Sequence, residues 1–228
     1  MVGAAYGRIA ALILTGLGLA QPGAAQELPG AFRAIGQITY GSPPSPGAAI
    51  CTGTLVAPDL VLTAGHCVTG TAEKPLAPAD IRFAAGWQDG HAVAMAQGRE
   101  VIRSGLAGLP GDTALLRLAT PIGPSAVVPI ALSAGTGAER VFTTLGYRRD
   151  APERPVAKSG CRLITAESAL LGLGCTVVSG NSGAPLLVWR GGSWQLVAVL
   201  VAQSRVPGPI RAIAVIPDPG LRAQILPP

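Results

Sequence analysis

Ser182 lies between two glycines in the segment 179–188, and a proline and an apolar run follow it directly. Glycine lets the backbone adopt positive φ angles and approach a ligand closely, because it has no Cβ atom. Such a loop can hold a serine hydroxyl outward while neighbouring N–H groups point into a shared hollow. Acyl transfer requires this combination of a nucleophile and donors that face the oxygen on which negative charge develops. The Gly-x-Ser-x-Gly pattern also occurs in α/β-hydrolases and by chance, so other residues must decide between these interpretations.

His66 is the second residue whose position suits this chemistry. It ends the apolar segment 60–66 and is followed directly by Cys67. A disulfide from Cys67 to Cys51 would fix the backbone that carries the imidazole. A general base needs such support, because a positional error of about 1 Å can lower a rate on the order of 100-fold. Taken alone, a histidine that merely ends a strand is an equally good interpretation, and His91 in its turn-like segment is interpreted as a surface residue.

Asp112 follows Pro110-Gly111 and opens the apolar segment 112–118. A carboxylate at the start of an apolar strand can accept a hydrogen bond from an imidazole N–H, which holds the tautomer of the base and stabilises the imidazolium. Taken alone, Asp112 is better explained as a turn aspartate. His66, Asp112 and Ser182 together, each in a fitting local context, favour a nucleophilic serine with a general base and an orienting acid.

The elements that must position these side chains are predicted to be β-strands. Amphipathic helical stretches are almost absent, and short β-rich runs recur between Gly, Pro, Asp and Asn residues, which favours an all-β fold. The twelve candidate strands are 34–40, 50–56, 60–63, 81–85, 93–101, 114–118, 140–147, 159–165, 174–178, 186–189, 195–202 and 212–216. Two six-stranded barrels would give this number. We also expect a crossover at 121–129, a loop at 41–46 and a short helix at 219–226.

Residues 1–25 are predicted to be a signal peptide that is not part of the fold. Arg8 precedes an apolar run over 9–19, and the small residues 23–25 offer a cleavage site, with 18–20 as a second candidate. This run of 11 residues is much shorter than the roughly 20 that a spanning helix needs, which disfavours an uncleaved membrane anchor. We therefore expect an exported protein, secreted or periplasmic, with no stable membrane association after the signal is removed.

Charge and cysteine content narrow the class of protein. Removal of Arg8 lowers the formal net charge from +5 to +4, and the basic residues are scattered, so nucleic acid is not an expected partner. Four cysteines in an exported chain indicate two disulfides, and the sequence leaves three connectivities open. Local pairing of Cys51 with Cys67 and of Cys161 with Cys175 would close loops of roughly 15 residues and stabilise by about 3 kcal/mol each. No Cys-x-x-Cys or paired-histidine spacing is present, so a zinc site is disfavoured.

The order His66, Asp112, Ser182 and its sequence context resemble those of the chymotrypsin-like (trypsin-like) serine peptidases, nearest the bacterial glutamyl-endopeptidase-like branch. The segments that carry the resemblance are 51–56, 63–67, 112–116, 144–147 and 180–185. The resemblance implies an all-β fold of two six-stranded antiparallel β-barrels, with the active site in the cleft between them. Residues 26–228 would form the peptidase domain, with barrel one at about 26–125 and barrel two at about 126–228.

The resemblance also implies a role for each site residue. Ser182 would be the nucleophile, His66 the general base and then acid, and Asp112 the residue that orients His66. The backbone N–H groups of Gly180 and Ser182 would form the oxyanion hole, and the strand at 199–203 would pair with the substrate backbone. The expected function is that of an exported serine endopeptidase. It would act on protein or peptide substrates through an acyl-enzyme, as a monomer and without a metal or organic cofactor.

The residues predicted to bind the substrate side chain are Thr176, Val201, Ala202 and Gln203. Thr176 lies six residues before the serine, where trypsin-type members keep an aspartate, so cleavage after Arg or Lys is disfavoured. Glutamyl endopeptidases use a histidine on the strand after the nucleophile, and 195–204 contains none, so cleavage after acidic residues is not supported either. Small or apolar side chains are the expected preference.

Asn181 departs from many animal-type members, which carry an aspartate there to bind the ammonium of a newly formed N-terminus. A neutral amide cannot form that ion pair, and the segment 33–37 lacks a good match to the usual activation sequence. We therefore expect activity without this switch, as in the glutamyl-endopeptidase-like branch, where asparagine is usual.

Two alternatives belong to other functional classes. A catalytically silent, peptidase-like binding protein usually lacks a member of the triad, whereas all three residues are present here. An α/β-hydrolase esterase has the chain order Ser, Asp, His and needs helical periodicity, and this chain has neither.

Overall fold

The computed structural model describes residues 1, 29–40, 50–70, 75–135 and 137–226. The predicted signal peptide (1–25), apart from Met1, and the predicted loop at 41–46 lie outside the described residues. Within the described ranges, no helix is long and apolar enough to cross a membrane.

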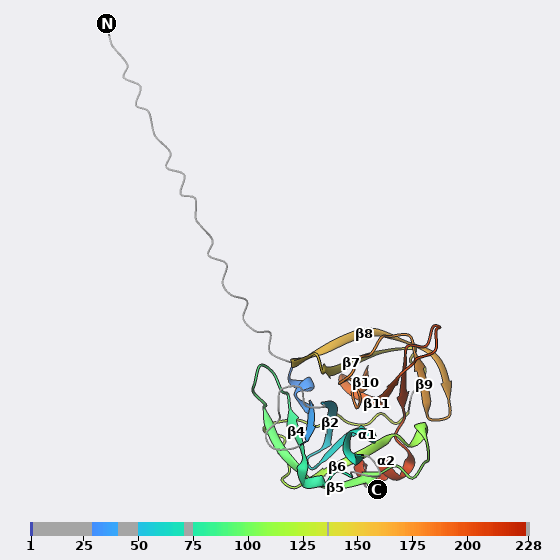
Figure 1. Cartoon of the computed structure of the whole chain (residues 1–228). Helices are drawn as coiled ribbons and strands as arrows, with labels where there is room; N and C mark the ends of the chain where they lie inside the picture. The colour runs from blue at the N-terminus through green and yellow to red at the C-terminus, as the bar shows by residue number, and fades with distance from the viewer. Residues whose placement is uncertain (2–28, 41–49, 71–74, 136, 227–228) are drawn as a thin grey trace.

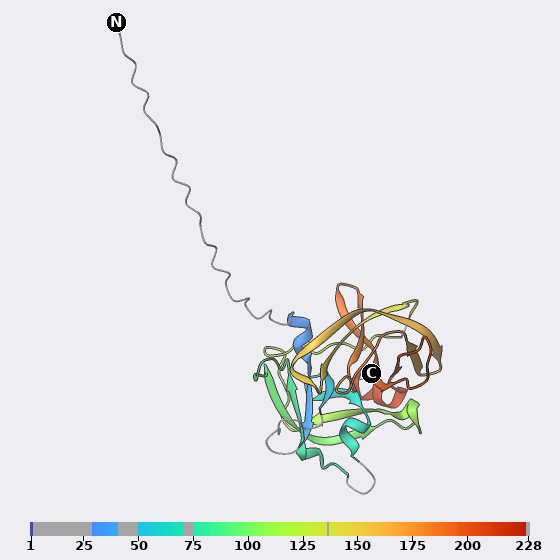
Figure 2. The same cartoon turned by 45° about the horizontal axis from the view of Figure 1, so that its top comes forward.

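Two closed six-stranded barrels make up the structure, and every strand pair in them is antiparallel. The first barrel has the strand order β1-β2-β3-β6-β5-β4. Its strands are β1 (Ile35–Tyr40), β2 (Cys51–Ala57), β3 (Leu60–Ala64), β4 (Ile81–Ala85), β5 (Ala94–Arg103) and β6 (Thr113–Leu118). The blue-to-green barrel and the yellow-to-red barrel lie side by side in Figures 1 and 2. The predicted fold class is confirmed.

The second barrel has the strand order β10-β11-β12-β9-β8-β7. Its strands are β7 (Val141–Arg148), β8 (Ala151–Glu167), β9 (Leu170–Leu173), β10 (Pro185–Arg190), β11 (Ser193–Gln203) and β12 (Ala212–Val215). The helical elements are short and lie before, between or after the strands. They are η1 (Gly30–Ala34), α1 (His66–Thr69), η2 (Pro78–Asp80), η3 (Leu109–Gly111) and α2 (Pro219–Ile225).

Apolar side chains at the junction form one core that both barrels share. Leu62 and Leu116 of the first barrel belong to the same buried cluster as Leu187 and Val199 of the second. All four side chains are fully buried, and each such burial contributes about 1.5–3 kcal/mol. This packing sets the relative position of the barrels, and with it the position of any residue at their junction.

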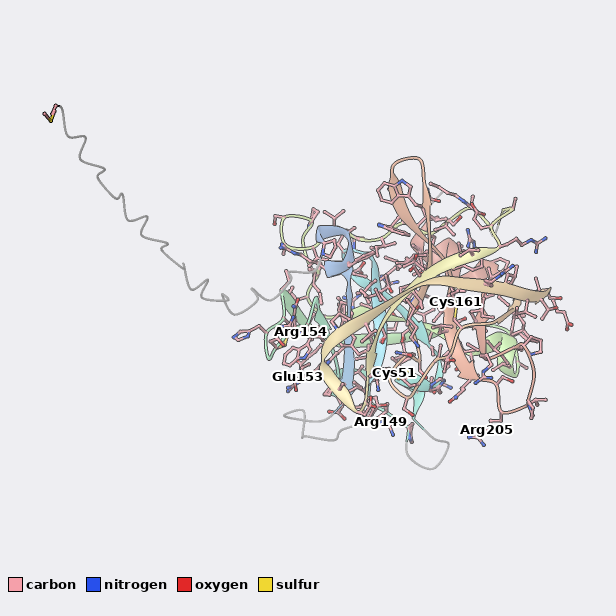
Figure 3. The ribbon with its side chains drawn as sticks, turned by 90° about the horizontal axis from the view of Figure 1, so that it is seen from above. Cys51, Arg149, Glu153, Arg154, Cys161 and Arg205 are labelled. Carbon is pink, nitrogen blue, oxygen red and sulfur yellow. A yellow bond between two sulfur atoms is a disulfide. The ribbon has the colours of Figure 1, made fainter. Side chains whose placement is uncertain are left out.

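Polar contacts from the β7–β8 hairpin add to this junction. Glu153 and Arg154, labelled in Figure 3, lie just after the turn of the hairpin. The backbone N–H of Asp89 donates to the Glu153 carbonyl at 2.8 Å, and Arg154 forms an ion pair with the Asp89 carboxylate. The Tyr147 hydroxyl donates to the Trp87 carbonyl at 2.8 Å, and burial raises the pKa of Tyr147, so the phenol stays neutral and keeps its proton for this bond. These contacts join the hairpin, which belongs to the second barrel, to the connection between β4 and β5 of the first barrel.

The strand predicted at 174–178 is wrong. The structure places β9 at Leu170–Leu173, between β8 and β12, and the chain after it leaves the sheet. Val178 explains this departure: its N–H donates to the Asn181 side-chain Oδ1, and its carbonyl accepts from the Asn181 N–H, each at 3.0 Å. Because these backbone groups bind the loop that carries Ser182, they are not available to a neighbouring strand.

Other predicted elements differ mainly in extent. The strand predicted at 159–165 is the middle of the longer β8, whose first half pairs with β7 and whose second half pairs with β9. The segment 121–129 contains no strand and connects the two barrels, as predicted. The predicted terminal helix is α2, which Asp218 caps by accepting hydrogen bonds from the first backbone N–H groups of the helix.

The two disulfides have the local connectivity, Cys51–Cys67 and Cys161–Cys175. The first joins the start of β2 to α1, and the second joins β8 to the segment that follows β9. Each therefore holds a short connection next to the junction or to the Ser182 loop, rather than joining distant parts of the chain.

Candidate active site

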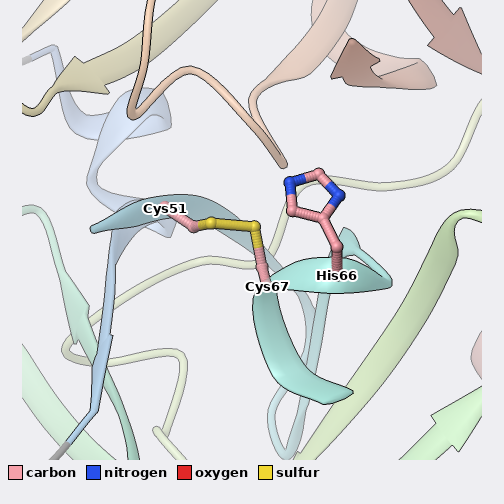
Figure 4. Close-up of side chains that lie close together, drawn as sticks. All are labelled: Cys51, His66 and Cys67. Atoms are coloured by element: carbon pink, nitrogen blue, oxygen red, sulfur yellow. A yellow bond between two sulfur atoms is a disulfide. The ribbon is translucent and has the colours of Figure 1, made fainter. Parts of the chain in front are cut away.

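His66 is positioned by the end of β3 and by a disulfide. Strand β3 ends at Ala64, and the single-turn helix α1 begins at His66. Cys67 is fully buried and bonded to Cys51, so the backbone on one side of the imidazole is covalently attached to β2. Figure 4 shows the imidazole standing beside this disulfide. The side chain remains 47 % exposed, which leaves the ring accessible to a substrate.

Asp112 uses both of its carboxylate oxygens to hold His66. Oδ1 accepts a hydrogen bond from the His66 backbone N–H at 2.8 Å, and Oδ2 lies 2.8 Å from Nδ1 of the ring. The Asp112 carbonyl also accepts from the Gly65 N–H at 3.1 Å. Because a carboxylate only accepts hydrogen bonds, Nδ1 carries a proton and Nε2 is left with its lone pair. In this tautomer the imidazole can take up a proton at Nε2 while Asp112 fixes the orientation of the ring.

Ser182 lies against β2, the strand that begins with Cys51. Its carbonyl accepts a hydrogen bond from the Thr52 N–H at 2.8 Å. The neighbouring Gly183 has φ of 85°, and a Cβ atom there would overlap the carbonyl oxygen of Thr52. Glycine is therefore required for this approach. The contact joins the Ser182 loop to β2, the strand that the Cys51–Cys67 disulfide links to the helix that carries His66.

The loop around Ser182 leaves two backbone N–H groups without a hydrogen-bond acceptor among the described residues. The Ser179 carbonyl accepts from the Arg149 N–H, and the Asn181 carbonyl accepts from the Ala184 N–H, each at 2.9 Å. In a trans peptide the C=O and N–H groups point in opposite directions. The N–H groups of Gly180 and Ser182 therefore face away from these partners, and within the described part of the chain neither donates a hydrogen bond. An oxyanion hole requires backbone donors that are free in this way.

Gly180 and Asn181 show why this loop keeps its shape. Gly180 has φ of 100°, and a Cβ there would lie 2.8 Å from both Arg149 N and the Tyr147 carbonyl oxygen. Asn181 is 8 % exposed, and its Nδ2 donates to the Tyr147 carbonyl at 2.8 Å while its Oδ1 accepts from Val178. The amide is satisfied inside the protein, at the position where an aspartate would need a cation.

A pocket of about 160 Å³ adjoins Ser182. The predicted residues Val201, Ala202 and Gln203 line it. Thr176 is not among the lining residues: it is exposed, and its carbonyl accepts from the Lys158 ammonium at 2.5 Å. The wall of this pocket begins one residue later, at Val177.

Five further lining residues were not predicted to bind the substrate side chain: Val177, Val178, Ser179, Asn181 and Leu200. The first three directly precede the Ser182 loop, which was the available signal, but the incorrect strand at 174–178 concealed it. None of the lining side chains is charged at neutral pH.

A second, wider cleft of about 490 Å³ lies along His66 and Asp112. Leu106 and Leu109, from the segment before Asp112, form its apolar part, and Arg103 contributes the one permanent cation among its lining residues.

The sulfur atoms of Cys51 and Cys67 and a ring nitrogen of His66 lie within 4.8 Å of one another. This group resembles a metal site only in its composition. The two sulfurs are bonded to each other and offer no thiolate ligand.

The comparisons with known proteins agree with this geometry. The family model described as Trypsin matches residues 22–215. A Glu endopeptidase structure is 24 % identical, with a TM-score of 0.69, and the match covers 85 % of this chain and 88 % of that one. The thermostable serine protease AL20 from an extremophilic microorganism is 17 % identical (TM-score 0.63, 83 % and 92 % covered), and the protease Anisep from Arthrobacter nicotinovorans is 20 % identical (TM-score 0.61, 83 % and 91 % covered). No curated protein matched the sequence.

Two six-stranded antiparallel barrels, together with the match to the family model, define a chymotrypsin-like serine peptidase. The matched region covers most of the chain, and the chain belongs to the trypsin family of serine endopeptidases.

Proposed function

We propose that this chain is an exported serine endopeptidase that hydrolyses peptide bonds through an acyl-enzyme on Ser182. The observation that carries the proposal is the commitment of both Asp112 carboxylate oxygens to His66, next to the loop that holds Ser182. An aspartate in an ordinary turn would have no reason to bind the backbone and the ring of one histidine together.

The proposed reaction has two halves. Ser182 Oγ attacks the substrate carbonyl carbon while His66 Nε2 takes the hydroxyl proton, and the oxygen that becomes negative is bound by the N–H groups of Gly180 and Ser182. The tetrahedral intermediate collapses as the protonated His66 gives its proton to the leaving amine, which forms the acyl-enzyme. In the second half, a water molecule attacks the acyl-enzyme while His66 takes its proton. The second tetrahedral intermediate collapses as His66 returns that proton to Ser182 Oγ, and the carboxylic acid product is released. Asp112 stabilises the imidazolium in both halves.

The pocket beside Ser182 supports a preference for small, uncharged side chains on the amino side of the cleaved bond. Its volume is about 160 Å³, and Val177, Leu200 and Val201 give it apolar walls. Burial of an unpaired charge there would be costly. Profiling on a peptide library should therefore enrich small aliphatic residues at that position, and enrichment of Lys, Arg, Asp or Glu would contradict this part of the proposal.

We also propose that activity does not depend on a newly formed N-terminus. Asn181 already binds Tyr147 and Val178 within the chain, so its loop needs no ammonium partner. Chains that begin at Gln26 and at Ala34 should show the same kcat/KM. A large gain on trimming to Ala34 would count against this mechanism.

The proposal includes export of the protein, removal of the signal peptide and action as a monomer. Two disulfides suit an oxidising compartment, and the segment 1–25 has the composition of a signal peptide. Processing at residue 25 would leave 26–228 as the peptidase domain. Mass spectrometry of the protein recovered from the culture medium or periplasm tests this cleavage site.

A serine-directed fluorophosphonate tests the central proposal. Wild-type protein should be labelled and should cleave peptides, whereas Ser182→Ala should do neither although it folds. A wild-type protein that is folded but unlabelled would contradict the proposed enzymatic activity. It would instead support a catalytically silent, peptidase-like binding protein.

A further inference from the structure

Thr52 lies at the point where the first barrel meets the Ser182 loop. It is the second residue of β2, is fully buried, and follows Cys51 of the first disulfide. Its backbone N–H donates to the Ser182 carbonyl at 2.8 Å. Its side-chain hydroxyl makes two further hydrogen bonds, both to the second barrel. One residue of the first barrel therefore makes three hydrogen bonds to the second.

The direction of these hydroxyl bonds follows from chemistry. The Tyr147 backbone N–H lies 3.0 Å from Thr52 Oγ1 and can only donate, so the oxygen accepts there. The hydroxyl has a single proton, and its remaining partner is the Gly180 carbonyl oxygen at 2.9 Å, which can only accept. The hydroxyl therefore donates to Gly180 and cannot be replaced by a group that only accepts or only donates.

Thr52 donates two of the four hydrogen bonds that hold consecutive carbonyl groups of the Ser182 loop. The carbonyls of residues 179, 180, 181 and 182 each accept a hydrogen bond, and Thr52 supplies the bonds to 180 and 182. The Gly180–Asn181 peptide joins the two peptides whose N–H groups form the oxyanion hole. Gly180 has no side chain to restrict rotation, so two hydrogen bonds set the orientation of this peptide: its N–H donates to the Val178 carbonyl at 3.0 Å, and its carbonyl accepts from the Thr52 hydroxyl at 2.9 Å.

We propose that Thr52 is a positioning residue for the oxyanion hole, because its hydroxyl holds the Gly180 carbonyl and thereby aims the N–H groups of Gly180 and Ser182 at a common point. The inference rests on the proposed function, since it assigns the hydroxyl a part in that reaction. Without the hydroxyl, the Gly180 carbonyl and the Tyr147 N–H lose their partner in a buried site, and the loop relaxes.

Thr52→Val tests the proposal, because valine keeps the branched shape and removes the hydroxyl. Loss of one oxyanion donor lowers kcat by about 10²- to 10³-fold, and displacement of the donors should cost part of this, about 10- to 100-fold. KM for a peptide anilide should change little, since the oxyanion contact forms in the transition state. Thr52→Ser keeps the hydroxyl and should restore kcat to within about threefold of wild type.

Thr54→Val is the matched control. Thr54 lies two residues further along β2, is also fully buried, and its hydroxyl has no hydrogen-bond partner among the described residues. The same atoms are removed, so any general effect of the substitution on the barrel appears in this variant. Its kcat should equal that of wild type.

The measurements are kcat and KM on the best anilide from the peptide library, the rate of fluorophosphonate labelling, and the melting temperature. The kcat and labelling rate of Thr52→Val should fall together at a temperature where every variant is folded. A Thr52→Val enzyme that melts earlier but keeps wild-type kcat would overturn the proposal. If Thr52→Val does not fold, Thr52→Ala carries the same test, and failure of both to fold would assign the hydroxyl to folding alone and overturn it too. An inactive, unlabelled wild type would instead reject the proposed function itself.

Discussion

The replacement of Asp112 by asparagine gives the sharpest test of the His66–Asp112 geometry. Both carboxylate oxygens accept hydrogen bonds from His66 donors 2.8 Å away, one in the backbone and one in the ring. Asparagine has one oxygen and one NH2 group. Whichever way the amide turns, its NH2 group faces one of the two donors.

Each orientation of the amide has a cost that can be worked out. If the amide oxygen keeps the His66 backbone bond, Nδ1 must accept from the NH2 group, so the proton moves to Nε2 and the ring can no longer act as a base; this tautomer costs about 10⁴-fold in kcat. If the oxygen instead keeps the Nδ1 proton in place, the His66 backbone N–H loses its acceptor, at about 1–3 kcal/mol, and meets a second donor. The active orientation is therefore a minor one. We expect kcat of Asp112→Asn to fall by about 10²- to 10⁴-fold.

The assay is kcat on a peptide anilide at neutral pH, with the melting temperature measured in parallel. Asp59→Asn is the matched control, because Asp59 is paired with Arg117 at 2.9 Å in the first barrel and is not among the residues of the candidate site. It should keep wild-type kcat. A folded Asp112→Asn variant that retains more than a tenth of wild-type kcat would refute the reasoning.

Three further predictions concern packing, covalent links and charge. Gly183→Ala should abolish activity and lower stability, because its Cβ would overlap a backbone carbonyl of β2; wild-type kcat with an unchanged melting temperature would contradict this contact. Replacement of Cys161 and Cys175 together by serine should remove about 3 kcal/mol and lower the melting temperature by roughly 6–12 °C, measured by circular dichroism, and a shift below about 2 °C would show that the loop needs no covalent closure. A hydrogen bond from Arg190 lowers the pKa of Glu139 below 4.5, so the pair stabilises above that pH and the contribution is lost as pH falls through the lowered value. The melting temperatures of wild type and Glu139→Gln should therefore differ most at neutral pH and converge in acid, and a constant difference across the range would contradict this.

Much of the fold was accessible from the sequence because its signals are local. Alternating apolar residues between Gly and Pro turns predicted twelve strands, and eleven of the predicted segments overlap strands of the structure. The exception, 174–178, has the composition of a strand, but Asn181, three residues beyond it, binds the N–H of Val178 with its side chain and the carbonyl of Val178 with its backbone N–H. Local composition carries no information about that competition.

The candidate site, like the fold, was predictable from the sequence in some residues and not in others. The residue types, their order along the chain and their glycine and cysteine neighbours were enough to select His66, Asp112 and Ser182. Thr176 was selected by counting back from the serine, and the structure instead begins the pocket wall at Val177, because the chain has already left the sheet there.

The sequence by itself determined the chemistry that is available and the class of fold, since both depend on which residues occur and on their local spacing. Only the tertiary structure decided how Asp112 divides its two oxygens over His66, which cysteines pair, and that Thr52 binds the loop that carries Ser182. The two partners of the Thr52 hydroxyl are 95 and 128 residues away along the chain. Hydrogen bonds at such separations exist only once the barrels have closed and packed together, and no local pattern of residues specifies them.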